Sequence, residues 1–216
     1  DLDNRNMVNG DGNLAIIEAD EYADAFLSYT PSIAVITNVE VDHLDYFGTE
    51  ENFFSSFNQF IERIIPDGIL LISHDDEGAR TLRKNCNRED IRIESFSTVN
   101  ENADWYAKDI VFSASSELTS FEIYMKGRRL GGSSLRLTGD HNVSNFLAAL
   151  AASMHAGADY SRASEIATSV RGARRRFELV GEVSLRQSIS SIQSRKVTVI
   201  DDYAHHPSEI KATIAA

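Results

Sequence analysis

The first third of the chain alternates between short continuous runs of apolar residues and segments with helical spacing. Each apolar run is four or five residues long, which is typical of strands buried on both faces of a parallel sheet. The runs cover residues 14–17, 33–37 and 69–72. Apolar positions repeat at helical spacing over residues 53–65, and a further helix is expected over residues 75–85. This alternation predicts an α/β fold with a mostly parallel sheet flanked by helices.

Beyond residue 100 the pattern changes to consecutive strands. These are expected over residues 105–112, 119–125 and 129–138. Lys126 and Gly127 fall between the last two and predict a tight turn there. The three strands therefore predict a small antiparallel meander appended to the parallel part of the sheet.

The last third of the chain predicts two helices and two strands. The apolar face of the first helix begins at Val143, and Gly157 is a good stop for that helix. The other expected elements are a helix over residues 161–170, strands over 178–185 and 197–200, and a serine-rich loop over 188–194. We expect a domain boundary near Asp201.

The composition is that of a globular chain able to bury a core. The chain has 216 residues, of which 42% are hydrophobic, and a formal net charge of -12. This acidic balance argues against a nucleic-acid-binding surface, although local basic clusters can still bind anions. The longest apolar runs are far shorter than the ~20 residues that a membrane-spanning helix needs, so no membrane insertion is expected.

Cys86 is the only cysteine, so an internal disulfide is excluded. A reducing compartment, most simply the cytoplasm, is therefore expected. Position 1 is Asp rather than Met, and the last residues have the pattern of a helix that stops part-way. We therefore expect a piece of a longer protein.

Two acidic motifs follow the first two predicted strands. Residues 18–21 (EADE) carry three carboxylates, which repel one another unless a cation is present, and oxygen ligands of this kind suit Mg²⁺. Residues 37–45 (TNVEVDHLD) place His43 between two aspartates that can set its tautomer. The alternatives are a solvated acidic loop and a packed or surface histidine. Because both motifs are expected at the same sheet edge, where ligands of such folds bind, a shared metal site is favoured.

Two further motifs suggest nucleotide contacts. In residues 139–145 (GDHNVSN), Asn142 would serve as a helix N-cap, whereas the amide of Asn145 has no capping role and can pair with an adenine edge. Residues 174–177 (RRRF) form a basic cluster in an acidic chain, and arginine binds phosphate in a forked geometry. The alternative for the cluster is a solvated basic surface.

The fifth motif, residues 201–207 (DDYAHHP), is dense in polar groups and follows a predicted strand. A zinc site is not expected there, because adjacent histidines are not a usual ligand pair. The chain has no G-x-x-x-x-G-K-[ST] phosphate loop and no G-x-G-x-x-G. From the residues alone we expect an acidic α/β protein that binds metal and phosphate, with its reaction open.

Taken in order, the five motifs EADE, TNxExDH, GxHNxxN, RRRFE and DDYAHHP resemble those of the Mur ligases of peptidoglycan synthesis. Each motif is weak alone, but their shared order and spacing are specific. The resemblance runs from about residue 14 to the C-terminus and implies the P-loop-type fold of the family's central domain. It implies that residues 1–200 are the central ATP-binding domain and that residues 201–216 begin a Rossmann-like C-terminal domain. The family's phosphate loop would then lie upstream of Asp1.

The resemblance also implies a reaction. It is the ATP-dependent, cytoplasmic addition of L-alanine to UDP-N-acetylmuramate through an acyl phosphate, with ATP and Mg²⁺ bound and no nucleic acid involved. Residues 44–63 hold no lysine, which favours the alanine-adding branch over branches with a carbamoylated lysine. Alternatives are a murein-tripeptide recycling ligase, a metal-dependent hydrolase and a non-catalytic binding module.

The roles that the resemblance implies fall on eight residues. Glu18, His43 and Arg176 would be catalytic, with Glu18 and His43 as the Mg²⁺ ligands. The nucleotide would contact Asn142 and Asn145 at adenine, Arg176 at the phosphates and Asp202 at the ribose. The substrate side of the cleft would hold Tyr203 and His205.

Overall fold

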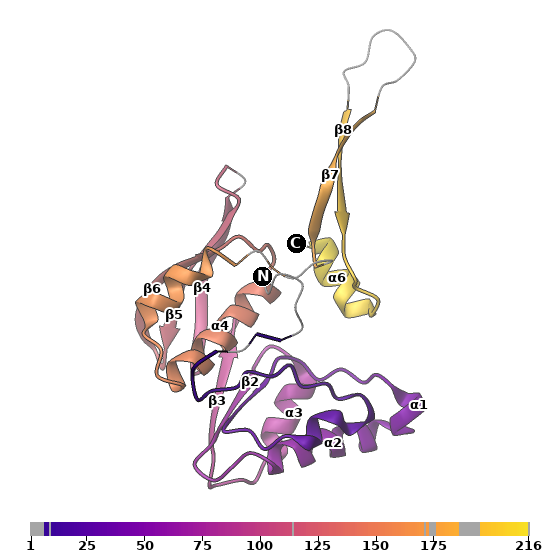
Figure 1. Ribbon diagram of the computed structural model, residues 1–216, viewed down its shortest axis with the longest axis vertical. Coiled ribbons are helices and arrows are strands. Elements are labelled where there is room, and N and C mark those ends of the chain that lie inside the picture. Colours follow the sequence, from indigo (N-terminus) through magenta and orange to yellow (C-terminus); the bar gives the residue numbers. More distant parts are fainter. Residues whose placement is uncertain are drawn as a thin grey trace.

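The computed structural model describes residues 7–8, 10–113, 115–170, 172, 176–185 and 195–215. Its main sheet has six strands that lie side by side in sequence order (Figure 1). The first four strands run parallel, and the last three form an antiparallel meander. The strands are β1 (Ile33–Ile36), β2 (Ile69–Ser73), β3 (Arg92–Ser97), β4 (Trp105–Ser113), β5 (Leu118–Met125) and β6 (Arg128–Leu135). The predicted fold class, a mostly parallel sheet with an antiparallel meander, is confirmed.

Helices cover both faces of this sheet (Figure 1). α2 and α3 pack with β1 and β2 in one core, whereas α4 and α5 pack in a second core with the meander. The helical elements are η1 (Tyr22–Ser28), α1 (Leu44–Phe47), α2 (Glu50–Glu62), α3 (Glu77–Asn85), α4 (Asp140–His155), α5 (Tyr160–Ala167) and α6 (Pro207–Ala215). The predicted helices correspond to α2, α3, α4 and α5, while η1 and α1 were not predicted.

β2 shows how the two cores share one sheet. All five of its residues are buried. Leu70 and Ile72 enter the core under α2 and α3, while Ile69 and Leu71 enter the core under α4. Since successive side chains of a strand point to opposite faces, a continuous apolar run is what a strand covered on both sides needs.

β3 was missed at the sequence level because its buried positions include polar residues. The side chain of Glu94 is only 4% exposed. Its carboxylate accepts hydrogen bonds from Trp105 Nε1 (2.8 Å) and Lys126 Nζ (2.8 Å), and it lies 2.8 Å from His155 Nε2. A buried carboxylate is stable only when its oxygens are paired in this way, and such pairing cannot be seen in the strand's own pattern.

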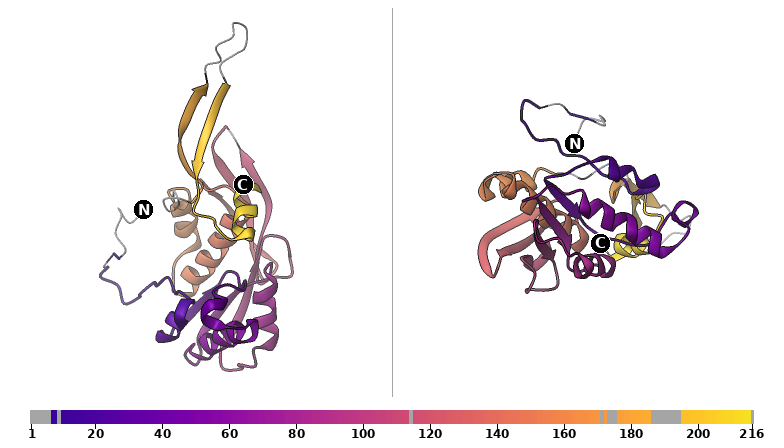
Figure 2. Two further views of the ribbon diagram at one scale, coloured as in Figure 1. Left: turned by 90° about the vertical axis from the view of Figure 1, so that its right-hand side faces the viewer. Right: turned by 90° about the horizontal axis from the view of Figure 1, so that it is seen from below.

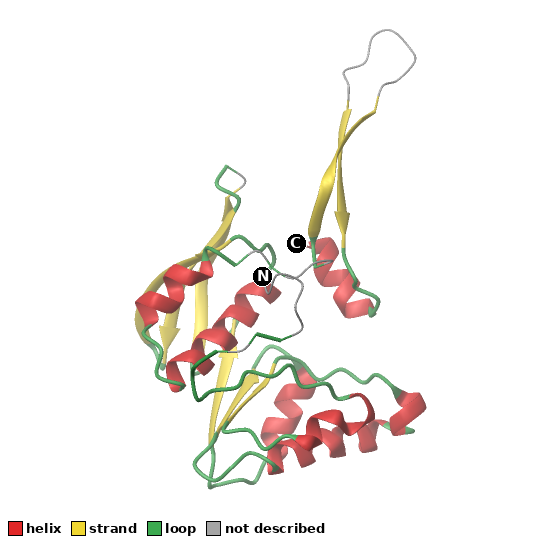
Figure 3. Cartoon of the chain, in the orientation of Figure 1, coloured by secondary structure: helices red, strands yellow, loops and turns green. Residues whose placement is uncertain are grey.

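The strand predicted over residues 14–17 is wrong. This segment runs as a loop, and Ile16 is fully exposed (Figure 3). Within the described residues, β1 is the edge strand of the sheet and pairs only with β2. A strand needs a neighbour for its backbone hydrogen bonds, and no described strand pairs with this segment.

Turns and helix ends agree with the predictions, with one exception. Lys126 and Gly127 both have positive φ (49° and 78°), as a two-residue hairpin turn requires. Gly157, with φ 97°, follows the end of α4. Asn142, however, is not the N-cap: Gly139 holds that position, and Asn142 lies inside α4, where its amide donates to the carbonyl of Thr138.

The last two strands form a sheet of their own. β7 (Glu178–Leu185) and β8 (Arg195–Asp201) pair antiparallel, project away from the six-stranded sheet and lead into α6 (Figures 1 and 2). The serine-rich loop predicted over residues 188–194 lies outside the described residues. In the part of the chain that the structure describes, every helix is too short or too polar to cross a membrane.

Candidate functional site

The loop after β1 is held against the start of α3. The backbone N–H of Val39 donates to Asp76 Oδ1 (2.9 Å), and the same oxygen caps α3 by accepting from the N–H of Ala79 (2.7 Å). At Gly78 a Cβ atom would lie 2.0 Å from the carbonyl oxygen of Val39, so only glycine permits this close approach. The loop therefore presents Glu40 and His43 from a firmly anchored base.

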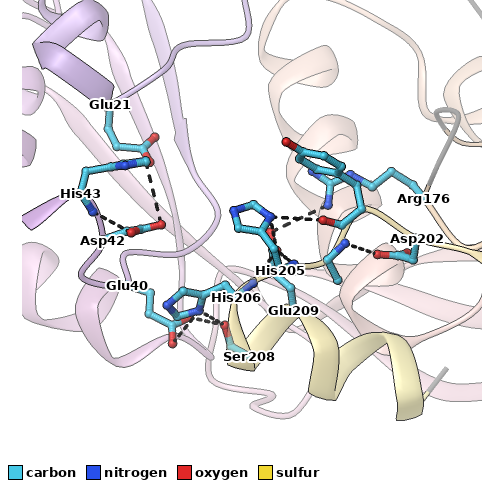
Figure 4. Close-up of polar contacts among 12 residues, drawn as sticks. Glu21, Glu40, Asp42, His43, Arg176, Asp202, His205, His206, Ser208 and Glu209 are labelled. Carbon is cyan, nitrogen blue, oxygen red and sulfur yellow. Dashed lines mark hydrogen bonds and ion pairs between the residues drawn. The ribbon is translucent and has the colours of Figure 1, made fainter.

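His43 lies between two carboxylates at the carboxyl end of β1 (Figure 4). Its Nε2 is 3.9 Å from Glu21 Oε1 and 3.9 Å from Asp42 Oδ2. The His43 backbone is left-handed (φ 53°), and its N–H donates to Asp42 Oδ1 (2.7 Å). The ring of Tyr22 meets the imidazole edge-on, with centroids 4.9 Å apart. The two acidic motifs thus meet at one sheet edge, as predicted.

The carboxylate that faces His43 is Glu21, and the assignment of Glu18 as a Mg²⁺ ligand stays a prediction. Glu18 is exposed, and within the described residues no hydrogen bond or ion pair joins it to His43. The motif was identified from sequence, but the choice of residue within it depends on the path of a loop. Among the described residues, no three His, Cys, Asp or Glu side chains gather closely enough to hold a metal by themselves.

The start of α6 lies beside the same loop (Figure 4). Ser208 Oγ donates to Glu40 Oε2, and His206 Nδ1 lies 3.4 Å from Glu40 Oε1. Glu209 accepts from the backbone N–H groups of His205 (3.1 Å) and His206 (3.3 Å), which satisfies donors at the helix start. The motifs TNVEVDH and DDYAHHP, about 160 residues apart in sequence, therefore touch.

Asp202 joins the residue before β7 to the segment after β8, at one end of the β7–β8 sheet. Its Oδ2 accepts from the N–H of Phe177 (2.7 Å) and its Oδ1 from the N–H of Ala204 (2.7 Å). Burial raises the pKa of Asp202, but these hydrogen bonds outweigh it, so the pKa lies below its ordinary value. The carboxylate is therefore ionised at neutral pH.

Arg176 and the substrate-side residues lie close to Asp202. Arg176 is exposed, with Nη1 3.8 Å from Glu209 Oε1. The rings of Tyr203 and His205 lie edge to face, 5.3 Å apart, and both side chains are exposed. The other arginines of the basic motif, residues 174 and 175, lie outside the described residues. The guanidinium of Arg176, the phenol of Tyr203 and the imidazole of His205 are thus all accessible to solvent.

A cavity of about 390 Å³ opens at the start of α4. Its walls come from β4, β5, the start of α4 and α6, and consist of Ile110, Phe112, Thr119, Gly139, Asp140, His141 and Ala212. Desolvation lowers the pKa of His141 despite the opposing charges of Asp202 and Asp140, so its ring is favoured in the neutral form. The lining is mixed: Ile110, Phe112 and Ala212 give it an apolar side, and this side together with a neutral imidazole suits a flat ring system.

The two asparagines predicted at adenine lie next to this cavity without lining it. The amide of Asn142 donates to the carbonyl of Thr138 (2.7 Å) and lies 3.0 Å from His141 Nε2. Asn145 is exposed one turn further along α4. Sequence reasoning singled out the asparagines of the motif and overlooked His141, which stands inside the same motif.

The family's middle-domain signature covers most of the chain. The Mur ligase middle domain matches residues 2–153. This chain belongs to the Mur ligase family. It is 38% identical over 207 residues to UDP-N-acetylmuramate–L-alanine ligase of Caldanaerobacter subterraneus subsp. tengcongensis, covering 96% of this chain and 42% of that relative. The corresponding ligase of Desulforamulus reducens is 35% identical, with 96% and 41% covered. The chain thus spans about two fifths of the length of these curated relatives.

Solved Mur ligases share the fold. MurC, the UDP-N-acetylmuramate–alanine ligase of Thermotoga maritima, superposes with a TM-score of 0.67 at 24% identity, covering 89% of this chain and 39% of that one. MurF ligase of Thermotoga maritima, solved in complex with ADP, gives 0.66 at 21% identity, with 86% and 38% covered. The UDP-N-acetylmuramate:L-alanyl-γ-D-glutamyl-meso-diaminopimelate ligase (MPL) of Neisseria meningitides gives a TM-score of 0.61 at 28% identity, with 73% of this chain and 48% of that one covered.

Proposed function

We propose that this chain is the ATP-binding part of a cytoplasmic ligase that joins L-alanine to UDP-N-acetylmuramate during peptidoglycan precursor synthesis. The observation that carries the proposal is the meeting of the TNVEVDH and DDYAHHP segments through Glu40, His206 and Ser208. This meeting supports a single site, because it joins the segment proposed to bind metal to the segment proposed to face the amino acid, at the end of the sheet where α/β folds bind ligands. The proposal is supported by relatives of that name at 35–38% identity.

The proposed reaction has two steps. The muramoyl carboxylate attacks the γ-phosphorus of ATP, the bond to the β–γ bridging oxygen breaks, and ADP leaves behind an acyl phosphate. The amine of L-alanine then attacks the acyl carbon, and the tetrahedral intermediate expels inorganic phosphate as the amide forms. Both steps gain most from positioning and from neutralisation of phosphate charge.

Each cluster has a role in this proposal. The cavity at His141 receives the adenine ring, with Asn142 and Asn145 beside it at the start of α4. Arg176 reaches the phosphates with its exposed guanidinium. Tyr203 and His205 face the incoming amino acid. Asp202 remains the proposed ribose contact, although two backbone N–H groups already bind its oxygens.

The donors around His43 fit Mg²⁺. This ion usually binds one or two protein ligands, and completes its shell with water and substrate phosphates. Glu21 and Asp42 supply carboxylate oxygens on both sides of His43, and Glu18 precedes them in the same motif. We propose that His43 and a carboxylate of the EADE motif hold the ion. When bound, Mg²⁺ supplies charge neutralisation at the transferred phosphate.

We also propose that the chain works within a longer enzyme. Residues 1–200 would belong to its central domain and residues 201–216 to the start of its C-terminal domain. The phosphate loop, absent from residues 1–216, would come from elsewhere in that enzyme.

The proposal is tested in the complete ligase by phosphate release with ATP, UDP-N-acetylmuramate and L-alanine. Release should require all three substrates. His43→Ala should lower kcat by at least about tenfold and raise the Mg²⁺ requirement, as loss of one charge-stabilising contact implies. Glu18→Ala and Glu21→Ala, compared with the exposed control Glu50→Ala, show which carboxylate acts with His43. Phosphate release that needs no UDP-N-acetylmuramate would instead indicate a hydrolase.

A murein tripeptide ligase is the second candidate, because the Neisseria MPL structure is 28% identical to this chain. The two functions differ in the amine that is accepted. Supplying L-alanine and the tripeptide in equal concentration, and identifying the product by mass spectrometry, separates them. A product that contains only the tripeptide would overturn the L-alanine proposal.

A further inference from the structure

Glu40 links two parts of the chain that share no strand pairing. The six-stranded sheet ends at β6, and β7 and β8 pair only with each other. Glu40, on the loop after β1, contacts His206 and Ser208 at the start of α6 (Figure 4). These contacts join the loop after β1, in the part of the chain that forms the six-stranded sheet, to α6, which follows the β7–β8 sheet; Glu40 and Ser208 are 168 residues apart in sequence.

The base from which Glu40 projects is fixed. The preceding residue, Val39, is only 4% exposed, and its N–H is bound by Asp76. The contact with Gly78 leaves no space for this loop to move toward α3. Loss of the Glu40 contact should therefore move the start of α6 rather than the loop that carries Glu40.

The side chains of His206 and Ser208, which contact Glu40, are also held in place. Glu209 already satisfies the N–H groups of His205 and His206, which leaves the side chains of His206 and Ser208 for Glu40. His206 Nδ1 lies 2.9 Å from Ser208 Oγ, so the two side chains face Glu40 together. A carboxylate near a helix N-terminus is also favoured by the helix dipole.

The contact between Glu40 and His206 is weak enough to form and break reversibly. The side chain of Glu40 is 45% exposed and that of His206 is 28% exposed. Partly exposed pairs of this kind contribute little to global stability, because water competes for both partners. The contact is therefore suited to docking one unit on another, rather than to holding either unit folded.

We propose that Glu40 is a positioning residue that docks the segment 205–208 on the carboxyl end of β1. Docking sets the separation between the His43 cluster and the substrate-side groups Tyr203 and His205. Glu40 touches neither substrate nor metal in this role. The inference rests on the proposed function for its kinetic readout, but its structural readout is independent of any activity.

The test uses Glu40→Ala and Ser208→Ala, singly and combined, in the complete ligase. Glu89→Ala is the matched control, since Glu89 is an exposed loop carboxylate. Hydrogen exchange followed by mass spectrometry should show faster exchange over residues 205–210 in Glu40→Ala, with α2 and β2 unchanged. The melting temperature should stay at the wild-type value. Unchanged exchange over residues 205–210 would overturn the proposal.

Kinetics supply the second readout. Each single variant should lower kcat/KM by about tenfold, the loss expected for one hydrogen bond to a charged group. The double variant should lose no more than Glu40→Ala alone, because Glu40→Ala already removes the contact that Ser208→Ala removes. Losses that multiply would refute a shared contact. A wild-type enzyme without ligase activity would refute the proposed function, while the exchange result would still decide the docking.

Discussion

The buried carboxylate of Glu94 makes the stability of this chain sensitive to acid. Burial by itself would raise the pKa of Glu94, but hydrogen bonds from Lys126, Trp105 and His155 outweigh it and lower the pKa to about 2. The ordinary value is 4.5. Because the folded-state pKa is depressed, the ionised form stabilises the fold above pH 4.5, and this stabilisation is lost as the pH falls toward 2.

The size of the effect follows from the two pKa values. At ~1.4 kcal/mol for each pH unit between them, ionised Glu94 contributes about 3 kcal/mol at pH 7. About 1.4 kcal/mol of this should remain at pH 3, because protonation of the folded state is still incomplete there. Its side chain is 4% exposed, so solvent screening reduces the figure little.

Urea unfolding of Glu94→Gln against wild type, from pH 7 to pH 3, measures this contribution. Trp105, the only tryptophan and itself a partner of Glu94, reports the transition by fluorescence. The difference in unfolding free energy should shrink to less than half between pH 7 and pH 3. The control Glu182→Gln, which breaks the exposed pair with Lys196, should change stability by less than about 1 kcal/mol at every pH. A stability difference between Glu94→Gln and wild type that stays constant with pH would show that the ionised carboxylate does not stabilise the fold in this way.

Three further substitutions test the supports of the site by the same unfolding measurement. Gly78→Ala should lower the free energy of unfolding by about 1–3 kcal/mol, because the added Cβ would meet the carbonyl of Val39. In the control Gly181→Ala the added Cβ meets no atom within 4 Å, and an equal loss of stability there would contradict the argument. Arg88→Ala should lower the free energy of unfolding by about 2–3 kcal/mol, because the Arg88 guanidinium donates hydrogen bonds to the carbonyls at the end of α2. Full retention of stability in Arg88→Lys would show that the planar, several-donor geometry of the guanidinium is unimportant. Asp76→Ala should lower the free energy of unfolding by about 1–2 kcal/mol, because α3 loses its N-cap, and it should speed hydrogen exchange in the loop after β1. Unaltered exchange in that loop would mean that other contacts hold it.

The local pattern was enough to predict most elements. The apolar run of β2, and the spacing of apolar residues within α2 and within α4, record which side chains of each element are buried. This pattern lies within the element and can be read from its own residues. The Lys126-Gly127 turn is likewise local, because its backbone angles depend on those two residues. The order of the five motifs was also sufficient to indicate the Mur ligase family, which the match over residues 2–153 confirms.

Errors arose where an element depends on distant partners. Residues 14–17 have the composition of a strand, but no described strand pairs with them. β3 forms although it buries Glu94, because partners from β4, α4 and the turn between β5 and β6 satisfy the carboxylate. In both cases the hydrogen bonds that decide the outcome are not encoded within the segment itself.

The residue pattern alone was enough to infer the fold class, the family and the segments that carry polar chemistry. Long-range packing sets which member of each segment faces which partner: Glu21 at His43, and Glu40 at His206 and Ser208. The physical reason is that periodicity records burial, which is a property of one element. Side-chain pairing depends on the paths of two loops and on the close packing that holds them, such as the contact between Gly78 and Val39.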